Sequence, residues 1–385
     1  MNADLTQKMQ AWRHHLHRMP ELGYQEHRTA EFLAARLAGM GYAPVTGLGG
    51  TGLVARLQGQ GLRPPIGLRA DMDALPIPEE TGLDYASVNP GVMHACGHDG
   101  HMAMLLGAAQ ALRHGPPPPG DVWFIFQPAE ETGAGARRMI EDGLFRIAPV
   151  ARVFGLHNWP DLPQGRFSAC VGAQMAAVDQ FDITVTGRGC HAAMPQSGQD
   201  ALLAASQIHQ MLQSVVARNI DPLESGVVSV TQIHGGTAYN VLPERVEMRG
   251  CTRSLSEATA QLIHDRMSAI CASVAAGFGL RIDLERRRGY PVLNNTAEEV
   301  AIARAAAARA LGPEAVDPAP RPSMASEDFA FMLQERPGCY AFLGTATGEG
   351  HRLHSPTYRF NDAILPMGAA WWMALAGGAE APGSV

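Results

Sequence analysis

Strand-like and helix-like segments alternate along the first half of this 385-residue chain, and their order restricts the possible folds more than any other feature. The pattern predicts a helix over residues 4–40, strands at 51–59, 65–75, 122–128 and 150–160, and helices at 101–113 and 134–145. Such alternation is typical of a parallel α/β sheet, in which functional groups gather beyond the carboxyl ends of the strands.

The pattern changes near residue 177, where the sequence predicts a βαββαβ-like insert. We therefore predict an α/β protein in two domains. The larger domain, residues 1–176 and 289–385, has a mixed, mostly parallel sheet between helices, and residues 177–288 form a smaller α+β domain. The length agrees with this division, because single hydrophobic cores stop growing at roughly 250 to 300 residues.

Composition excludes several classes of function. The net charge is −7 and no basic stripe is present, so nucleic acid is not an expected partner. The polar N-terminus lacks the apolar core of a secretory signal, and no run reaches the roughly 18 apolar residues of a membrane span. We expect a cytoplasmic protein with no membrane partner, whose six cysteines are free thiols.

The stretch "MHACGHDGHMAML" at 93–105 concentrates potential metal ligands. In an extended loop, Cys96 and His98 would point the same way, and thiolate and imidazole are zinc-type ligands. No second pair has finger-like spacing, so distant residues must complete the site; Glu131, His157 and His354 are the candidates. His101 is expected to pack or to support a ligand, and His94 is ambiguous. Histidines on expected surface helix faces receive no role: His14, His15, His17, His27, His114, His209 and His264.

Glu130 and Glu131 stand side by side in "QPAEETGAG". Consecutive side chains diverge outside a helix, so one carboxylate can bind a metal while its neighbour takes a proton from water and returns it to a leaving amine. The alternative interpretation of an adjacent Glu pair is a solvated turn.

Several ordered motifs resemble the M20 metallopeptidase-like amidohydrolases, in the branch with hippurate hydrolase, N-acyl-amino-acid amidohydrolases and plant indole-acetyl-amino-acid hydrolases. The resemblance covers nearly the whole chain. Its motifs include "GLRADMDALPIPEETGLDYAS", "MHACGHDGHMAMLLGAA", "FIFQPAEETGAGARRMIEDGLF", "GRGCHAAMPQSGQDAL", "NVLPERVEMRGCTRSL" and "LHSPTYRFND".

The resemblance implies a role for each matching residue. Two divalent metals would be bound by Cys96, His98, Glu131, His157 and His354. Glu130 would be the general base, and Asp73 would orient a ligand. The insert would be a lid that also forms a homodimer. In it, His191 would stabilise the oxyanion, in its own or the neighbouring subunit's site, and Asn240 and Arg253 would hold the substrate. The chain reads "GCTR" where the family usually has "GTxR", which keeps Arg253.

The predicted activity is metal-dependent hydrolysis of the amide bond of an N-acyl amino acid. A di-metal aminopeptidase or dipeptidase could use the same centre, and a metal-binding protein without catalysis would leave Glu130 and the lid residues unexplained. The thiolate favours Zn, Co or Ni, whereas the carboxylate and imidazoles also accept Mn. The motifs do not specify the acyl group.

Overall fold

A computed structural model describes residues 3–348 and 352–378. These residues form two compact units. The first comprises residues up to Gln174, Leu293–Arg321 and the chain from Glu327 onward, and the second comprises Met175–Val292 and Pro322–Ser326. Within the described ranges, no helix combines the length and apolar character needed to cross a membrane.

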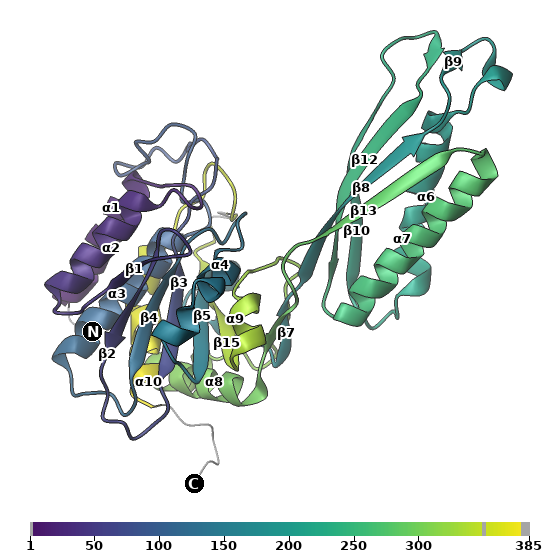
Figure 1. The fold of residues 1–385 in the computed structure, drawn as a ribbon. Coiled ribbons are helices and arrows are strands. Elements are labelled where there is room, and N and C mark those ends of the chain that lie inside the picture. The colour runs from purple at the N-terminus through teal and green to yellow at the C-terminus, as the bar shows by residue number, and fades with distance from the viewer. Residues whose placement is uncertain (1–2, 349–351, 379–385) are drawn as a thin grey trace. The chain divides into compact units, whose positions relative to one another are not determined.

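A seven-stranded sheet forms the centre of the first unit, in the order β1-β2-β4-β3-β5-β15-β6 (Figure 1). The four central strands are parallel, whereas β1, β2 and β6 add antiparallel pairs at the edges. This confirms the predicted mixed sheet with a parallel centre. The strands are β1 Val45–Leu48, β2 Gly52–Leu57, β3 Ile66–Asp71, β4 Val122–Gln127, β5 Arg152–Pro163, β6 Phe167–Ser168 and β15 Gly338–Ala346.

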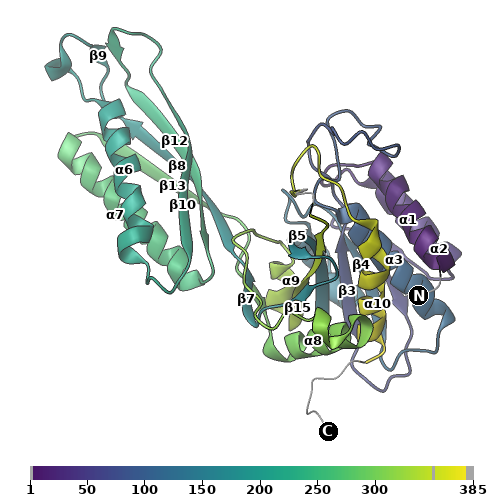
Figure 2. The ribbon, with the colours of Figure 1, turned by 180° about the vertical axis from the view of Figure 1, so that it is seen from behind.

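Helices cover both faces of this sheet (Figures 1 and 2). Alternate strand residues such as Phe124 and Phe126 enter one large core with α1, α2, α3, α8 and α10, since successive strand side chains point to opposite faces. The shorter α4, α5 and α9 lie on the other face. The helices are α1 Ala3–Arg18, α2 His27–Gly39, α3 His98–His114, α4 Gly135–Glu141, α5 Leu144–Ile147, α8 Ala297–Leu311, α9 Ala330–Glu335 and α10 Leu365–Ala376, with short 3-10 helices η2 Pro313–Ala315 and η3 Asp362–Ile364.

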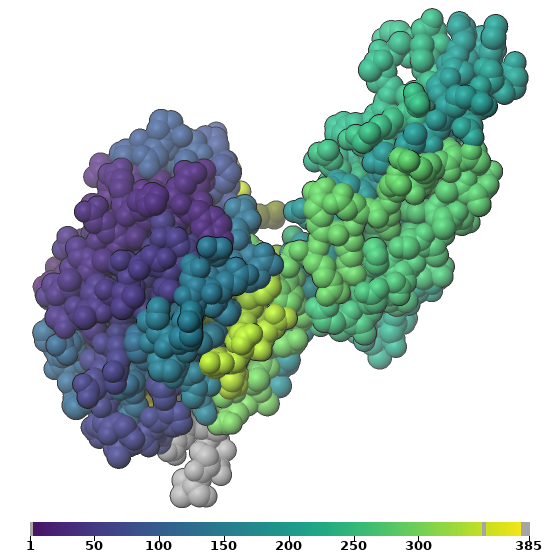
Figure 3. All heavy atoms as spheres, in the orientation of Figure 1, coloured from purple at the N-terminus to yellow at the C-terminus, as the bar shows by residue number. Residues whose placement is uncertain are grey.

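Several predicted boundaries were wrong. The helix expected over 134–145 is divided into α4 and α5, and the strand expected over 65–75 ends at Asp71. The helix expected over 4–40 is two helices, because residues 19–26 leave the helical path between α1 and α2. Helix α3 begins at His98 rather than at 101, and β5 continues through His157 to Pro163. The interruption between α1 and α2 places part of residues 21–26 beside the loop that follows β4. In the space-filling view, α1 and α2 form part of the outer surface of the first unit (Figure 3).

The second unit has the predicted βαββαβ order. Its antiparallel sheet, β10-β12-β8-β13, packs one face on α6 and α7 through a core that includes Phe181, Ile183, Val246 and Met248. The other face carries polar side chains, as expected for an antiparallel sheet with one solvated side. The elements are β8 Ala177–Thr186, β9 Cys190–His191, η1 Pro195–Ser197, α6 Ala201–Asn219, β10 Gly226–Gly235, β11 Val241–Leu242, β12 Arg245–Ser254, α7 Glu257–Phe278 and β13 Arg281–Arg288.

The chain enters and leaves the second unit through neighbouring segments. Strand β7 (Gly172–Met175) pairs with β14 (Leu293–Asn295). Just beyond them, the N–H of Val178 donates to the carbonyl of Tyr290 at 3.0 Å, and the N–H of Gly289 donates to the carbonyl of Val178 at 3.0 Å. The two passages of the chain therefore lie side by side.

Candidate metal centre

Cys96 and His98 are brought together by a turn at Gly97. The expectation of an extended loop was wrong, because Gly97 has a φ of +94° and His98 is already the first residue of α3. A Cβ at Gly97 would lie 2.3 Å from Asn158 Oδ1, so glycine is required both by the backbone angle and by the space. The turn places the thiol and the imidazole at one end of the sheet.

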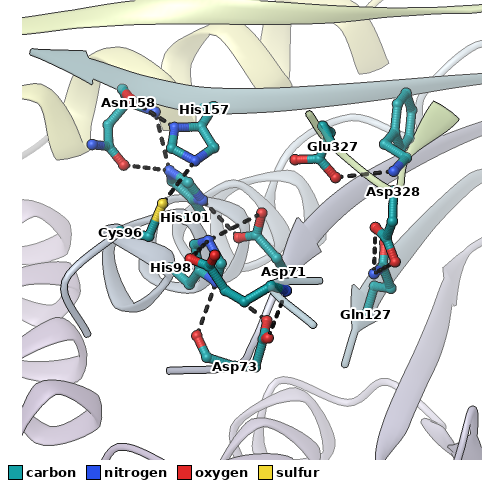
Figure 4. Close-up of polar contacts among 12 residues, drawn as sticks. Asp71, Asp73, Cys96, His98, His101, Gln127, His157, Asn158, Glu327 and Asp328 are labelled. Atoms are coloured by element: carbon teal, nitrogen blue, oxygen red, sulfur yellow. Dashed lines mark hydrogen bonds and ion pairs between the residues drawn. The ribbon is translucent and has the colours of Figure 1, made fainter. Parts of the chain in front are cut away.

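Three buried side chains form the first donor group. The possible ligand atoms of Cys96, His98 and His157 all lie within 4.8 Å of one another. Cys96 Sγ is 3.3 Å from His157 Nε2. His157 lies inside β5, near the level at which β3 ends, so its side chain reaches the same edge as the turn at Gly97. Figure 4 shows the cysteine and the histidines close together.

A second donor group shares the same thiol. Atoms of Cys96, Glu131 and His354 also lie within 4.8 Å of one another, and His354 Nε2 is 3.3 Å from Glu131 Oε1. The backbone of His354 has a φ of +60°, and its N–H donates to the carbonyl of Ala95 at 2.9 Å. All five side chains predicted as ligands are therefore gathered in two groups that meet at Cys96.

The protonation of the two buried histidines suits metal binding. His98 Nδ1 is 2.9 Å from the carbonyl of Asp73, and His157 Nδ1 is 2.6 Å from the carbonyl of Asn158. A carbonyl only accepts, so each Nδ1 carries a hydrogen, and Nε2 is the nitrogen that a metal would bind, on His98 in place of its second proton. Among the described residues, His98 Nε2 and Glu131 Oε1 are buried without a hydrogen-bond partner. Imidazole, thiolate and carboxylate donors with such unsatisfied atoms fit divalent metal ions.

The electrostatic potential at the centre is negative. Burial raises the pKa of the Cys96 thiol well above its usual value, and Glu131 and Glu130 raise it further. Burial lowers the pKa of His98, but Asp71 and Asp73 outweigh this effect and the pKa is about 10. The field that holds a proton on His98 also favours a cation in its place, and a bound dication would favour the thiolate.

Glu130 is a buried carboxyl beside these donors, which excludes the solvated turn. Burial raises its pKa well above the usual value, and the neighbouring Glu327 and Glu131 raise it further. One oxygen each of Glu130, Glu327 and Asp328 lies within 4.8 Å of the others. A carboxyl with a raised pKa takes up a proton more readily than an exposed one, as a general base requires.

Asp73 and His101 support the donors. Asp73 Oδ1 is 3.3 Å from His98 Nδ1, and its Oδ2 accepts from the N–H of Glu131 at 2.9 Å. His101 Nδ1 lies 2.6 Å from Asp71 Oδ1, and its Nε2 lies 3.0 Å from the N–H of Asn158 (Figure 4). Asp73 thus contacts two of the possible ligands, His98 and Glu131. His101 packs beside them without being one of the five predicted ligands, as expected.

The sequence interpretation missed a set of buried charges behind the centre. Arg69 in β3 donates to Asp71 at 2.8 Å, to Glu327 at 2.9 Å and to Asp328 at 3.1 Å. The only signal in the sequence was an arginine inside an otherwise apolar strand. Glu327 and Asp328 lie more than 250 residues further on, in the family-like segment "MASEDFAFMLQERPGCYAFLGT", but its residue types alone do not show that these acids are buried.

His17 was wrongly assigned to an exposed helix face. Its side chain is 1% exposed, with Nδ1 2.9 Å from Asp99 Oδ2 and Nε2 3.3 Å from Glu79 Oε1. Arg13, one helical turn earlier, also binds Asp99, at 3.1 Å. The i, i+4 spacing of the two residues on the side of α1 that buries Met9 and Leu16 could have indicated this.

The three remaining predicted residues belong to the second unit. His191 is exposed in β9, and its Nδ1 accepts from the N–H of Ala193 at 3.0 Å. Asn240 is exposed, and its carbonyl accepts from the N–H of Ala192 at 2.9 Å, so Asn240 and His191 are neighbours. Arg253 in β12 is half-buried and donates to the carbonyl of Met324 at 3.0 Å. Their action on a substrate stays a prediction.

Comparisons with known proteins identify the family of this chain. The model of peptidase family M20/M25/M40 matches residues 67–377. An N-acetyl-L-cysteine deacetylase of Bacillus subtilis is 40% identical over 354 residues, covering 92% of this chain and 83% of the relative. A hippurate hydrolase of Campylobacter jejuni is 39% identical over 373 residues, covering 97% of each chain.

A solved structure shares nearly the whole fold. It is described as a dinuclear metal-binding peptidase of the M20 family from Bacillus subtilis, is 33% identical, and aligns over 98% of both chains with a TM-score of 0.86. Together with the gathered donors and the buried Glu130, these matches show that the chain belongs to peptidase family M20/M25/M40.

Proposed function

We propose that this protein hydrolyses the amide bond of N-acyl amino acids and releases a carboxylic acid and the free amino acid. The observation that carries the proposal is the meeting of two donor groups at Cys96, next to the buried carboxyl of Glu130. Relatives named as an N-acetyl-L-cysteine deacetylase and a hippurate hydrolase, similar over most of their length, support an N-acyl amino acid as the substrate.

Two divalent ions would be held by Cys96, His98, Glu131, His157 and His354. When bound, such ions polarise a carbonyl and lower the pKa of water. The thiolate favours Zn, Co or Ni, and Mn is compatible with the remaining ligands.

Glu130 moves the proton. As the carboxylate it accepts the proton of the attacking water, and as the carboxylic acid it gives that proton to the amide nitrogen, which leaves as an amine. The raised pKa of Glu130, due to burial and to Glu327, supports this exchange because the carboxyl binds a proton more readily than an exposed one.

The second unit contributes substrate contacts in this proposal. His191 stabilises the oxyanion, and Asn240 and Arg253 hold the carboxylate of the amino acid. The proposal includes a cytoplasmic homodimer formed through this unit, with His191 serving its own site or that of its partner. Arg253 is tethered to Met324 and Ser326, which would hold its guanidinium in a fixed direction.

The test is a screen of N-acyl amino acids against metal-free protein reloaded with Zn, Mn, Co or Ni in turn. We expect hydrolysis of acetyl or benzoyl amino acids that depends on the added ion. Faster hydrolysis of dipeptides with a free amine would replace the proposal with a peptidase. Full metal loading without any amide hydrolysis would indicate a metal-binding protein instead.

A further inference from the structure

The loop between β4 and α4, residues 128–134, carries Glu130 and Glu131 and contains two alanines in the left-handed backbone region. Ala129 has a φ of +51° and Ala134 has a φ of +53°. Residues with a Cβ rarely adopt this conformation, because the Cβ approaches the following carbonyl oxygen. Contacts from outside the loop must therefore hold it in place.

One such contact comes from Glu26, which has no role in the proposed reaction. Its side chain is 0% exposed. Oε1 accepts from the N–H of Ala129 at 2.8 Å, and Oε2 accepts from Thr51 Oγ1 at 2.6 Å. Glu26 immediately precedes α2, but its side chain does not cap that helix. The buried carboxylate is directed at the 128–134 loop instead.

A second buried carboxylate holds the other side of Glu130. Asp73 Oδ2 accepts from the N–H of Glu131 at 2.9 Å. The N–H groups just before and just after Glu130 are thus each bound by a carboxylate, from Glu26 and from Asp73. Fixing the backbone on both sides fixes the directions in which the side chains of Glu130 and Glu131 leave it.

Close packing around Glu26 supports the same contact. A Cβ on Gly23 would lie 3.0 Å from the Cβ of Ala129, and a Cβ on Gly133 would lie 2.5 Å from the ring of Tyr24. The hydroxyl of Tyr24 donates to the carbonyl of Gly133 at 2.6 Å. The two glycines permit an approach that a side chain at either position would obstruct. Residues 23–26 and the 128–134 loop therefore pack as one body.

We infer that Glu26 is a positioning residue for the 128–134 loop. It holds Ala129 in the left-handed conformation, so that Glu131 stays among the metal donors and Glu130 keeps its direction. The roles of Glu130 and Glu131 in this inference rest on the proposed function. Glu26 belongs to none of the groups of possible metal donors among the described residues, and in this inference it acts through the backbone N–H of Ala129.

The test compares Glu26→Ala with Glu26→Gln, because the glutamine keeps an oxygen that can accept from Ala129. We expect Glu26→Ala to lower metal affinity by about tenfold to a hundredfold. Its kcat should fall by about a hundredfold with a smaller change in KM, because the misplaced loop harms chemistry more than binding. Glu26→Gln should stay close to the wild type in both. Metal affinity is measured by competition with a chromophoric chelator, which requires no substrate.

Glu299 provides the matched control. It is an equally buried glutamate of the first unit, in α8, where its carboxylate accepts from Thr296 Oγ1. Glu299→Ala should lower stability while metal affinity and kcat remain unchanged. If Glu26→Ala does not fold, Glu26→Asp replaces it, since the shorter side chain withdraws the acceptor and should lower both quantities.

Wild-type metal affinity and kcat in Glu26→Ala, or in the replacement Glu26→Asp, would overturn the inference. Equal losses of metal affinity and kcat in Glu26→Gln and Glu26→Ala would also overturn it, because the charge of Glu26 rather than its contact with Ala129 would then matter. If the wild type hydrolyses no N-acyl amino acid, the proposed function fails, whereas the chelator measurement still decides the role of Glu26.

Discussion

The two sheets differ in how far the ion pairs on them are buried. In the first unit, the ion pair between Arg69 and Asp71 is 1% and 0% exposed, and it lies directly behind the gathered donor atoms. In the second unit, Arg249 pairs with Asp182 on the open face of the sheet, where the two side chains are 54% and 22% exposed. Burying charge costs free energy unless every partner is present, so the first sheet gives up stability to hold a precisely placed site. The Arg249–Asp182 pair carries little of this cost, because both side chains stay in contact with water.

Removing the proton carrier should have the largest effect of any single change in the first unit. Glu130→Gln keeps the shape of the side chain but loses the base, so we expect kcat to fall by about 10³-fold or more while the metals stay bound. Steady-state kinetics and metal analysis of the same preparation check both parts. Loss of metal in this variant, or a rate near that of the wild type, would contradict the role of Glu130.

Arg69→Met tests the burial of charge in the first sheet. The variant leaves Asp71, Glu327 and Asp328 without their common cation, so we expect the free energy of unfolding to fall by about 3–5 kcal/mol. Urea unfolding followed by tryptophan fluorescence measures this directly, because all five tryptophans belong to the first unit. A loss below about 1 kcal/mol would show that these carboxyls become protonated at little cost.

Buried charge in the first unit also makes the free energy of unfolding depend on pH, through His17. Burial lowers the pKa of His17, but the opposite effect of Asp99 and Glu79 is larger, so the pKa is raised to about 9. A pKa raised above the unfolded value of about 6.5 stabilises the fold fully below pH 6.5, and this stabilisation disappears as the pH rises through 9. The difference in free energy of unfolding between wild type and His17→Gln should therefore shrink between pH 6.5 and 9. A difference that is constant over this range would contradict the charged His17.

The smallest effect is expected on the open face of the second sheet. Arg249→Met removes an exposed pair, so the free energy of unfolding should change by less than about 1 kcal/mol, with no change in the tryptophan signal. Circular dichroism follows the unfolding of both units, and its comparison with tryptophan fluorescence, which reports only the first unit, shows a change in the second. A loss as large as that of Arg69→Met would remove the distinction between the two sheets.

Much of the first unit could be predicted because its signals are local. The alternation of strands and helices specified the parallel centre, and the approximate strand ends placed Asp73, Glu131 and His157 on one edge. The order of strands and helices in the second unit could also be predicted, since strands such as β8 alternate buried residues with wholly or partly exposed ones.

The contacts that shape the site were less predictable because they depend on backbone angles and distant partners. The left-handed turn at Gly97 replaced an expected extended loop. Glu26 lies in the break between α1 and α2, where a continuous helix was predicted, so its contact with Ala129 could not be anticipated. The pattern that predicts a buried strand does not show which acidic residues a fold will bury.

The pairing of β7 with β14, where the chain enters and leaves the second unit, affects how such a protein can change during evolution. Because β7 and β14 lie side by side, the insert begins and ends at almost one place on the first unit. Insertions with adjacent ends can be enlarged, trimmed or exchanged for another module while the host domain keeps its own core. Each of the two units can thus change in sequence and size without disturbing the core of the other.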